Sequence, residues 1–221
     1  IVGLFIKNPE IEKNLGKYLS KMLIAMTERG PDSTGVAIYR DAVGSGSAKL
    51  TLLAPDSDYS WEALNLNLGV TFGDDYELNL QCDQAVLKVL TNAASAQTWV
   101  GERHPELRIN ATGEAIEIFK AKGTPARFVE NFNLGSYHGS HALGHTRMAT
   151  ESAVTTEHSH PFSTGADLCL VHNGSLSNHN QLREELLREG ITFQTDNDSE
   201  VAAGYLTWRM REGDSLETSL K

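Results

Sequence analysis

Short apolar runs typical of β-strands alternate along this chain with stretches whose apolar residues recur at helical spacing. The chain opens with a strand-type run over residues 1–6, and from Ile11 to Met26 apolar residues recur at three- and four-residue steps. This alternation of strands and helices predicts a mixed α/β layered domain. Strands separate the further helices, which are expected over 93–103, 125–132, 180–189 and after a cap at Asp198 or Ser199.

Two parts of the chain are less regular. The run Gly44-Ser45-Gly46-Ser47 is typical of a hairpin tip, which predicts that strands over 35–39 and 49–53 pair with each other. Between residues 55 and 83 only a short helix over 61–68 is indicated. The sequence contains no repeat, low-complexity tract or linker, so we expect one domain over residues 1–221.

The composition excludes several classes of protein. Of the 221 residues, 40% are hydrophobic and 22% are charged, which is the balance of an ordinary globular protein. The net charge is −10 with no basic run, so nucleic acids and anionic membrane surfaces would repel the chain. No apolar stretch approaches the roughly 20 residues that span a bilayer. Cys82 and Cys169 are too few for a disulfide framework or a cysteine zinc site, which favours a soluble protein of the reducing cytoplasm.

Four polar clusters interrupt the apolar pattern, and each has an ordinary structural interpretation when taken alone. The cluster over 29–35 is typical of a turn, and Asn-Gly in the cluster over 172–174 is a strong hairpin signal. Asp-Ser before an apolar periodic run is typical of a helix cap, and a single arginine on a strand is usually part of a surface ion pair. The clusters are 29–35 (RGPDSTG), 144–150 (GHTRMAT), 172–174 (HNG) and 195–201 (TDNDSEV).

Other site chemistries fit these clusters less well. His158, His160 and His172 invite a zinc interpretation, but the chain has no His-Glu-x-x-His run, and we expect no metal. The acidic residues of 196–200 are not joined by the glycine and the distal glutamate of an EF-hand calcium loop. The chain has no Gly-x-Ser-x-Gly elbow and no Gly-Lys-Ser phosphate loop, so a serine hydrolase and a P-loop enzyme are disfavoured.

The combination and order of the clusters resemble the class II glutamine amidotransferases, whose glutaminase domain belongs to the amino-terminal-nucleophile hydrolases. Six collinear matches are far more specific than any one of them. The segment over 41–140 and the Met-Ala-Thr-Glu-Ser form of the central motif look most like the amidotransferase subunits of glutamate-synthase-like enzymes, including the N-methylglutamate synthase type. The matching segments are 1–5 (IVGLF), 29–35 (RGPDSTG), 144–150 (GHTRMAT), 160–161 (HP), 171–174 (VHNG) and 197–201 (NDSEV).

The resemblance implies an α+β fold, the four-layer αββα sandwich, with residues 1–6 in a central sheet. The family has further strands after the helix that follows Asp198, so we expect the fold of the given chain to be incomplete at its C-terminal end. The family's nucleophile is an amino-terminal cysteine in the pattern Cys-Gly-Ile-Val-Gly, which implies a cysteine two positions before Ile1. Its α-amine, with an ordinary pKa of about 8, suits proton transfer at neutral pH. Neither Cys82 nor Cys169 carries a free amine, so neither can replace it.

The resemblance also implies a catalytic oxyanion site. Asn173, through its side-chain amide, and Gly174, through its backbone N–H, match the family's two donors to the developing negative charge. Arg29 lies where the family keeps an arginine near the nucleophile.

A clamp for the α-amino acid end of glutamine is implied in the same way. Arg147 matches the arginine that binds the α-carboxylate, a task that suits the fixed N–H fork of a guanidinium. Thr150 would add a hydroxyl to the same carboxylate, and Asp198 would hold the substrate ammonium by charge pairing. Met148 and Glu151 depart from residues that some relatives carry, and Glu151 leaves the local geometry of the clamp open.

These roles predict a glutaminase that converts L-glutamine to glutamate and ammonia and passes the ammonia to a synthase subunit in a hetero-oligomer. We expect no organic cofactor in this chain, because a flavin would belong to the partner. One alternative is a catalytically inactive glutamine-binding or regulatory subunit that lacks the nucleophilic cysteine. A second alternative is a hydrolase of the same superfamily that acts on another amide. Arg147 and Asp198 argue against it, because together they specify a free α-amino acid.

Overall fold

An antiparallel sheet of four strands lies at the centre of the computed structural model, which describes residues 1–148 and 155–220. Its strand order is β1-β8-β2-β7, so β2 pairs with a neighbour along both edges. Val2 on β1 lies opposite Gly144 on β8, which places Ile1 beside the end of β8. The strands are β1 (Val2–Phe5), β2 (Ser33–Tyr39), β7 (Ile116–Lys122) and β8 (His141–Arg147).

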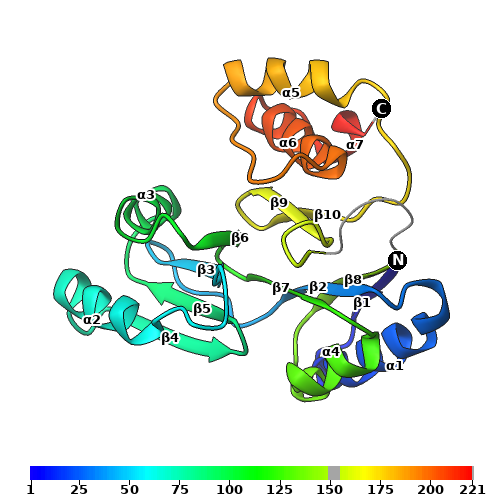
Figure 1. Ribbon diagram of the computed structural model, residues 1–221, viewed down its shortest axis with the longest axis horizontal. Coiled ribbons are helices and arrows are strands. Elements are labelled where there is room, and N and C mark those ends of the chain that lie inside the picture. The colour runs from blue at the N-terminus through cyan, green and yellow to red at the C-terminus, as the bar shows by residue number, and fades with distance from the viewer. Residues whose placement is uncertain (149–154, 221) are drawn as a thin grey trace.

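Helices cover one face of this central sheet (Figure 1). Successive side chains of a strand point to opposite faces, so Val36 and Ile38 of β2 and Phe119 of β7 meet the helix residues Leu19 and Leu23 in one buried cluster. Each such side chain contributes roughly 1.5–3 kcal/mol when it leaves water. The elements on this face, with η for a 3₁₀ helix, are η1 (Pro9–Asn14), α1 (Leu15–Ala25), η2 (Thr27–Arg29), α4 (Pro125–Asn131) and η3 (Leu134–Ser136).

A two-stranded sheet and a second group of helices cover the opposite face. Ala37 and Ile118 share a buried cluster with Cys169 of β10. The Tyr39 hydroxyl donates to the carbonyl of Asp167 at 3.1 Å. From α1 and α4 through both sheets to α5 and α6 the elements form four layers, which confirms the expected αββα order (Figure 1). The elements here are β9 (Phe162–Gly165), β10 (Leu168–Leu170), α5 (His179–Arg188), α6 (Asp198–Arg211) and α7 (Leu216–Ser219).

A second large antiparallel sheet, of order β4-β5-β3-β6, lies beside these layers (Figure 1). Two helices pack on it, and Leu52, Leu64 and Val100 share their buried cluster. Its link to the central sheet is partly apolar, since Ala111 of β6 packs in the cluster of Ala37 and Ile118. An ion pair adds to it, because Lys49 Nζ on β3 lies 3.1 Å from Glu117 Oε1 on β7. The elements are β3 (Ala48–Leu53), α2 (Trp61–Phe72), β4 (Tyr76–Gln81), β5 (Gln84–Val89), α3 (Ala93–Arg103) and β6 (Arg108–Gly113).

Two features of this second sheet differ from expectation. The turn at Gly44 forms, since Ser47 N–H donates to its carbonyl at 3.0 Å, but the expected hairpin is wrong. Both edges of β2 are already paired with β7 and β8, so β3 pairs with β5 and β6 instead. The irregular region over 55–83 contains β4, which the sequence analysis does not predict. Among the described residues, no helix combines the length and the apolar character needed to cross a membrane.

Candidate functional site

A cavity of about 230 Å³ lies where the start of the chain meets the end of β8. Three of the expected catalytic and substrate-binding residues line it: Arg29 from the end of η2, Arg147 from the end of β8 and Asn173 from the segment after β10. The fold therefore brings three distant parts of the sequence together at the beginning of the chain. The residues that line the cavity are Ile1, Met26, Arg29, His145, Thr146, Arg147, Met148 and Asn173.

Close packing fixes the positions from which the two arginines extend. Gly30, directly after Arg29, lies against the peptide that joins Thr146 to Arg147, and a Cβ atom at Gly30 would collide with the carbonyl carbon of Thr146. The backbone N–H of Asp32 donates to the carbonyl of Arg147 at 3.0 Å. Two guanidinium groups at one cavity favour the binding of an anion such as a carboxylate.

Asn173 and Gly174 are exposed on the segment that leads from β10 to α5. Among the described strands β10 pairs with β9 alone, so the hairpin interpretation of Asn173-Gly174 is wrong. A Cβ atom at Gly174 would lie 2.9 Å from Nε2 of His172. Glycine at position 174 thus lets the backbone lie directly against the imidazole ring.

Asp198 is the first residue of α6 and does not line the 230 Å³ cavity. Its Oδ2 accepts a hydrogen bond from the backbone N–H of Leu176 at 2.7 Å, which ties α6 to the segment after Gly174. The helix cap is Asn197, whose side chain accepts from the N–H of Ser199 at 2.8 Å. The expected cap at Asp198 or Ser199 is therefore wrong by one residue, because Asn197 holds the extended backbone that a cap requires.

The residues that follow β8 include Thr150, the remaining member of the expected clamp. Met148, which departs from the family pattern, is exposed and lines the cavity beside Arg147. Thr150 and Glu151 lie outside the described residues, so the contribution of Thr150 to the clamp stays a prediction.

Two histidines stack beside the cavity. The rings of His145 and His160 have centroids 4.3 Å apart and an interplanar angle of 23°. Burial lowers the pKa of His145 to about 4 and that of His160 to about 2, so both rings are uncharged at neutral pH. The Nδ1 atom of His160 accepts from the backbone N–H of His172 at 3.4 Å, which leaves the ring proton on Nε2.

Sequence reasoning missed part of the cavity wall. Met26, His145 and Thr146 line it, and the only signal for the last two is that they precede Arg147 in the Gly-His-Thr-Arg run. The Thr146 hydroxyl is buried and has no hydrogen-bond partner in the part of the chain that the structure describes. Within residues 1–148 and 155–220, no three His, Cys, Asp or Glu side chains gather to hold a metal ion.

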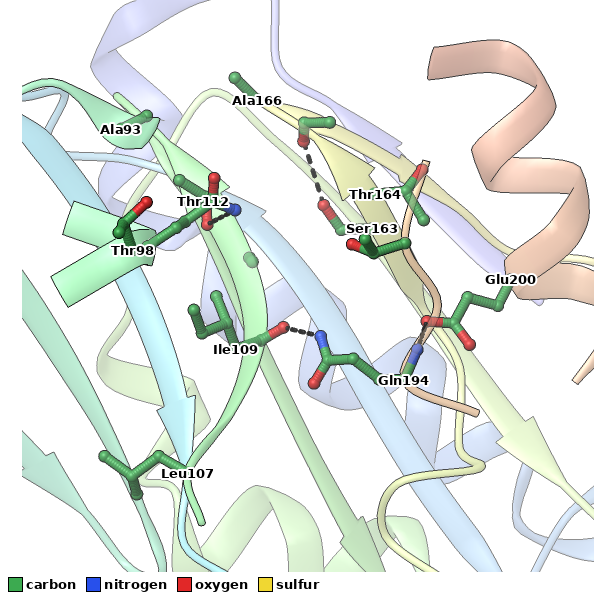
Figure 2. A pocket seen from close by; sticks show the side chains of 14 residues that line it. Ala93, Thr98, Leu107, Ile109, Thr112, Ser163, Thr164, Ala166, Gln194 and Glu200 are labelled. Atoms are coloured by element: carbon green, nitrogen blue, oxygen red, sulfur yellow. Dashed lines mark hydrogen bonds between the residues drawn. The ribbon is translucent and has the colours of Figure 1, made fainter. Parts of the chain in front are cut away.

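A larger cavity, of about 470 Å³, separates α3 and β6 from β9 (Figure 2). The carboxylate of Glu200 at its edge is bound within the fold, because it accepts from the backbone N–H groups of Gln194 and Thr195, each at 2.8 Å. The side chain of Gln194 donates to the carbonyl of Ile109 at 2.7 Å (Figure 2). These bonds join the loop before α6 to β6. None of the described residues expected to be functional lines this cavity.

Comparison with known proteins identifies the family. A family model described as a glutamine amidotransferase domain matches residues 133–216. The glutamine amidotransferase-like protein GlxB of Rhizobium meliloti (strain 1021) is 48% identical over 221 residues, which cover 100% of this chain and 73% of that protein. The chain belongs to the class II glutamine amidotransferase family. The matched residues of this amidotransferase include Arg147, Asn173 and Asp198, whereas Arg29 lies outside the match and the fold brings it to the cavity.

Two further similarities extend over the whole chain or nearly so. A putative glutamine amidotransferase of Methanothermobacter thermautotrophicus (strain Delta H) is 28% identical over 232 residues, covering 100% of this chain and 75% of that protein. A solved structure described as the allosteric regulatory enzyme of purine biosynthesis is 18% identical, with a TM-score of 0.47. The match covers 99% of this chain and 30% of the chain of that structure.

Proposed function

We propose that this protein, over residues 1–221, hydrolyses L-glutamine to glutamate and ammonia for a synthase partner of the glutamate-synthase type. The observation that carries the proposal is the 230 Å³ cavity, where Arg29, Arg147 and Asn173 surround the start of the chain. Hydrolysis of a side-chain amide needs a nucleophile, a base, an oxyanion site and a clamp for the amino acid. Each of these has a candidate in or next to the cavity.

The proposed nucleophile is the thiol of a cysteine two positions before Ile1, as the family pattern implies. Ile1 lines the cavity, and two residues of chain span at most about 7 Å, so such a thiol stays within reach of the arginines. It attacks the amide carbon of glutamine, and the α-amine of the same cysteine takes its proton and delivers it to the departing ammonia. The C–N bond breaks, a thioester remains, and water then releases glutamate and regenerates the thiol.

The proposed oxyanion donors are the side-chain amide of Asn173 and the backbone N–H of Gly174. Asn173 lines the cavity, and Gly174 follows it directly. Donors that are already aimed at the developing charge do not reorganise during the reaction, and one such donor is worth about 2.7–4 kcal/mol. This assignment gives Asn173 a role in turnover and not in the binding of glutamine.

The proposed clamp consists of Arg147 and Thr150 for the α-carboxylate and of Asp198 for the ammonium. The carboxylate of Asp198 binds the N–H of Leu176 through Oδ2 and the hydroxyl of Ser199 through Oδ1, at 2.7 and 3.3 Å. An ionised carboxylate has about four lone-pair sites, so two bonds leave capacity for an ammonium group. Asp198 would then link the substrate to the segment that carries the oxyanion donors.

The decisive experiment uses the protein with a processed amino-terminal Cys-Gly before Ile1. We expect this form to release glutamate and ammonia from L-glutamine, and a glutamine-like diazo ketone to label the added cysteine. The matched control has serine in place of that cysteine and should bind glutamine without hydrolysing it. Label on Cys82 or Cys169 would contradict the assigned nucleophile. Glutamine binding without hydrolysis by the cysteine form would favour the inactive glutamine-binding alternative.

A further inference from the structure

The segment that carries Asn173 and Gly174 is held from its N-terminal side by His172. The Nδ1 atom of the His172 ring lies 3.1 Å from the hydroxyl of Ser199, which is buried at the start of α6. The backbone N–H of the same residue donates to Nδ1 of His160 at 3.4 Å. One residue therefore connects this segment both to α6 and to the buried stack of His160 and His145.

The ring of His172 is also the surface against which Gly174 lies. A Cβ atom at position 174 would be 2.9 Å from Nε2 and 3.4 Å from Cε1 of that ring. On the far side of Gly174, the N–H of Leu176 is bound by Asp198 at 2.7 Å. The backbone at Asn173 and Gly174 thus lies between two anchors, and the imidazole sets how closely it approaches the fold.

The residues beneath His172 are closely packed and uncharged at neutral pH. His160 is 7% exposed, and its ring stacks on His145, which lines the cavity with Asn173. The carbonyl of His160 lies against Gly35 of β2, where a Cβ atom would collide with it. A buried ring that is packed on both sides can hold the backbone N–H of His172 in one position.

We propose that His172 is the positioning residue of the oxyanion site, fixing the backbone at Asn173 and Gly174 so that both donors point into the cavity. The inference rests on the proposed glutaminase function. His172 does not line the cavity and acts through its neighbours. Preorganised donors lose their advantage when they shift, and a displacement of about 1 Å can lower a rate by as much as about 100-fold.

The test compares two substitutions that remove different parts of the anchor. His172→Asn keeps a polar atom close to the position of Nδ1 but removes the ring edge that supports Gly174. Ser199→Ala removes the hydroxyl that lies 3.1 Å from Nδ1, and with it the hydroxyl's bond to Oδ1 of Asp198 at 3.3 Å. We expect kcat for glutamine to fall by about 10- to 100-fold in His172→Asn, with the Kd for glutamate unchanged, and to fall by less in Ser199→Ala. His138→Asn, at an exposed histidine paired with Asp41, is the matched control and should keep the parent's kcat.

A double-mutant cycle with Asn173→Ala separates positioning from a general effect on the fold. If His172 acts through the donors, His172→Asn should lower kcat much less in the Asn173→Ala background than in the parent. Multiplicative losses would overturn the proposal, as would a lower melting temperature with an unchanged kcat of the folded enzyme. Ser199→Ala gives the same comparison if His172→Asn does not fold. A parent that hydrolyses no glutamine would instead refute the proposed function itself.

Discussion

Arg147 is the side chain on which the proposed recognition of glutamine depends most. It extends from the end of β8 into the same cavity as Arg29. A guanidinium presents its N–H groups in a planar fork that matches both oxygens of a carboxylate, whereas a lysine ammonium acts as a point charge. An arginine at position 147 therefore provides a planar pair of N–H donors as well as a positive charge.

Replacement of Arg147 by lysine should weaken the binding of glutamine about tenfold or more, equivalent to about 1.4 kcal/mol, because the charge remains and the fork is lost. Calorimetric titration of the serine form of the nucleophile measures the Kd without turnover. Arg211→Lys is the control, since Arg211 pairs with Glu189 on the surface of α6 and lies outside the cavity. Equal affinity of Arg147→Lys and the parent would mean that Arg147 belongs to an ordinary ion pair.

Asn173 should affect a different step from Arg147. An oxyanion donor interacts mainly with charge that develops in the tetrahedral intermediate, so its loss lowers kcat far more than it raises KM. We expect Asn173→Ala to lower kcat by about 10²- to 10³-fold while glutamine still binds. Asn178→Ala is the control and should behave as the parent, because Asn178 is exposed and its side chain makes no capping hydrogen bond to α5. A loss of thermal stability alone would leave Asn173 a purely structural residue.

Among the elements, η2 packs closely on the end of β8 at Gly30, and we expect this contact to hold Arg29 beside Arg147. Gly30→Ala would place a methyl group against the peptide between Thr146 and Arg147. We expect the free energy of unfolding to fall by about 1–3 kcal/mol and glutamine to bind more weakly, because Arg29 and Arg147 move apart. Urea unfolding measures the first effect and titration the second.

The matched control for Gly30→Ala is Gly101→Ala in α3. A Cβ atom at Gly101 would meet nothing within 4 Å, so this change should be neutral or stabilising by up to about 1 kcal/mol, as for a glycine inside a helix. If both variants match the parent in stability, the close packing of η2 on β8 is not a requirement of the fold.

Elements with a strong local pattern are the ones that the sequence predicts well. The expected helix over 93–103 coincides with α3, which Asn92 caps through a bond to the N–H of Ser95. The strand β4 is an exception, because it alternates apolar and polar residues as a half-buried strand does, and the sequence analysis does not use that signal. The partners of β3 depend on pairing across dozens of residues, which no local pattern records.

The candidate site likewise contains residues that the sequence predicts and residues that only the fold reveals. Arg29, Arg147 and Asn173 stand out because motif order identifies them, and the fold then places them at one cavity. The support of His172 by His160 and Ser199 depends on how β9 and α6 pack, so the sequence carries no local signal for it. Motifs reveal the residues that touch a substrate more readily than those that hold them in place.

For the whole molecule, the histidine stack connects the two middle layers of the fold. His145 belongs to β8 of the central sheet, and His160 lies two residues before β9 of the smaller sheet. Burial lowers the pKa of His145 to about 4 and that of His160 to about 2, from 6.5 for an unfolded histidine. The unfolded chain therefore binds more protons than the folded one below pH 6.5. The stability that these rings provide is complete above pH 6.5 and is lost as the pH falls.

This linkage predicts that the free energy of unfolding falls between pH 7 and pH 5, by at most about 2 kcal/mol for each histidine. Urea unfolding at pH 7, 6 and 5 measures the slope. His160→Asn keeps an acceptor near Nδ1 but does not titrate, so it should flatten the slope even where it lowers stability at pH 7. Phe162→Leu is the control, because it removes an aromatic contact with His160, at 5.0 Å between centroids, and keeps the titrating ring. Phe162→Leu should therefore show the same slope as the unsubstituted protein. If the free energy of unfolding of the unsubstituted protein does not change from pH 7 to pH 5, the two rings are not buried neutral groups.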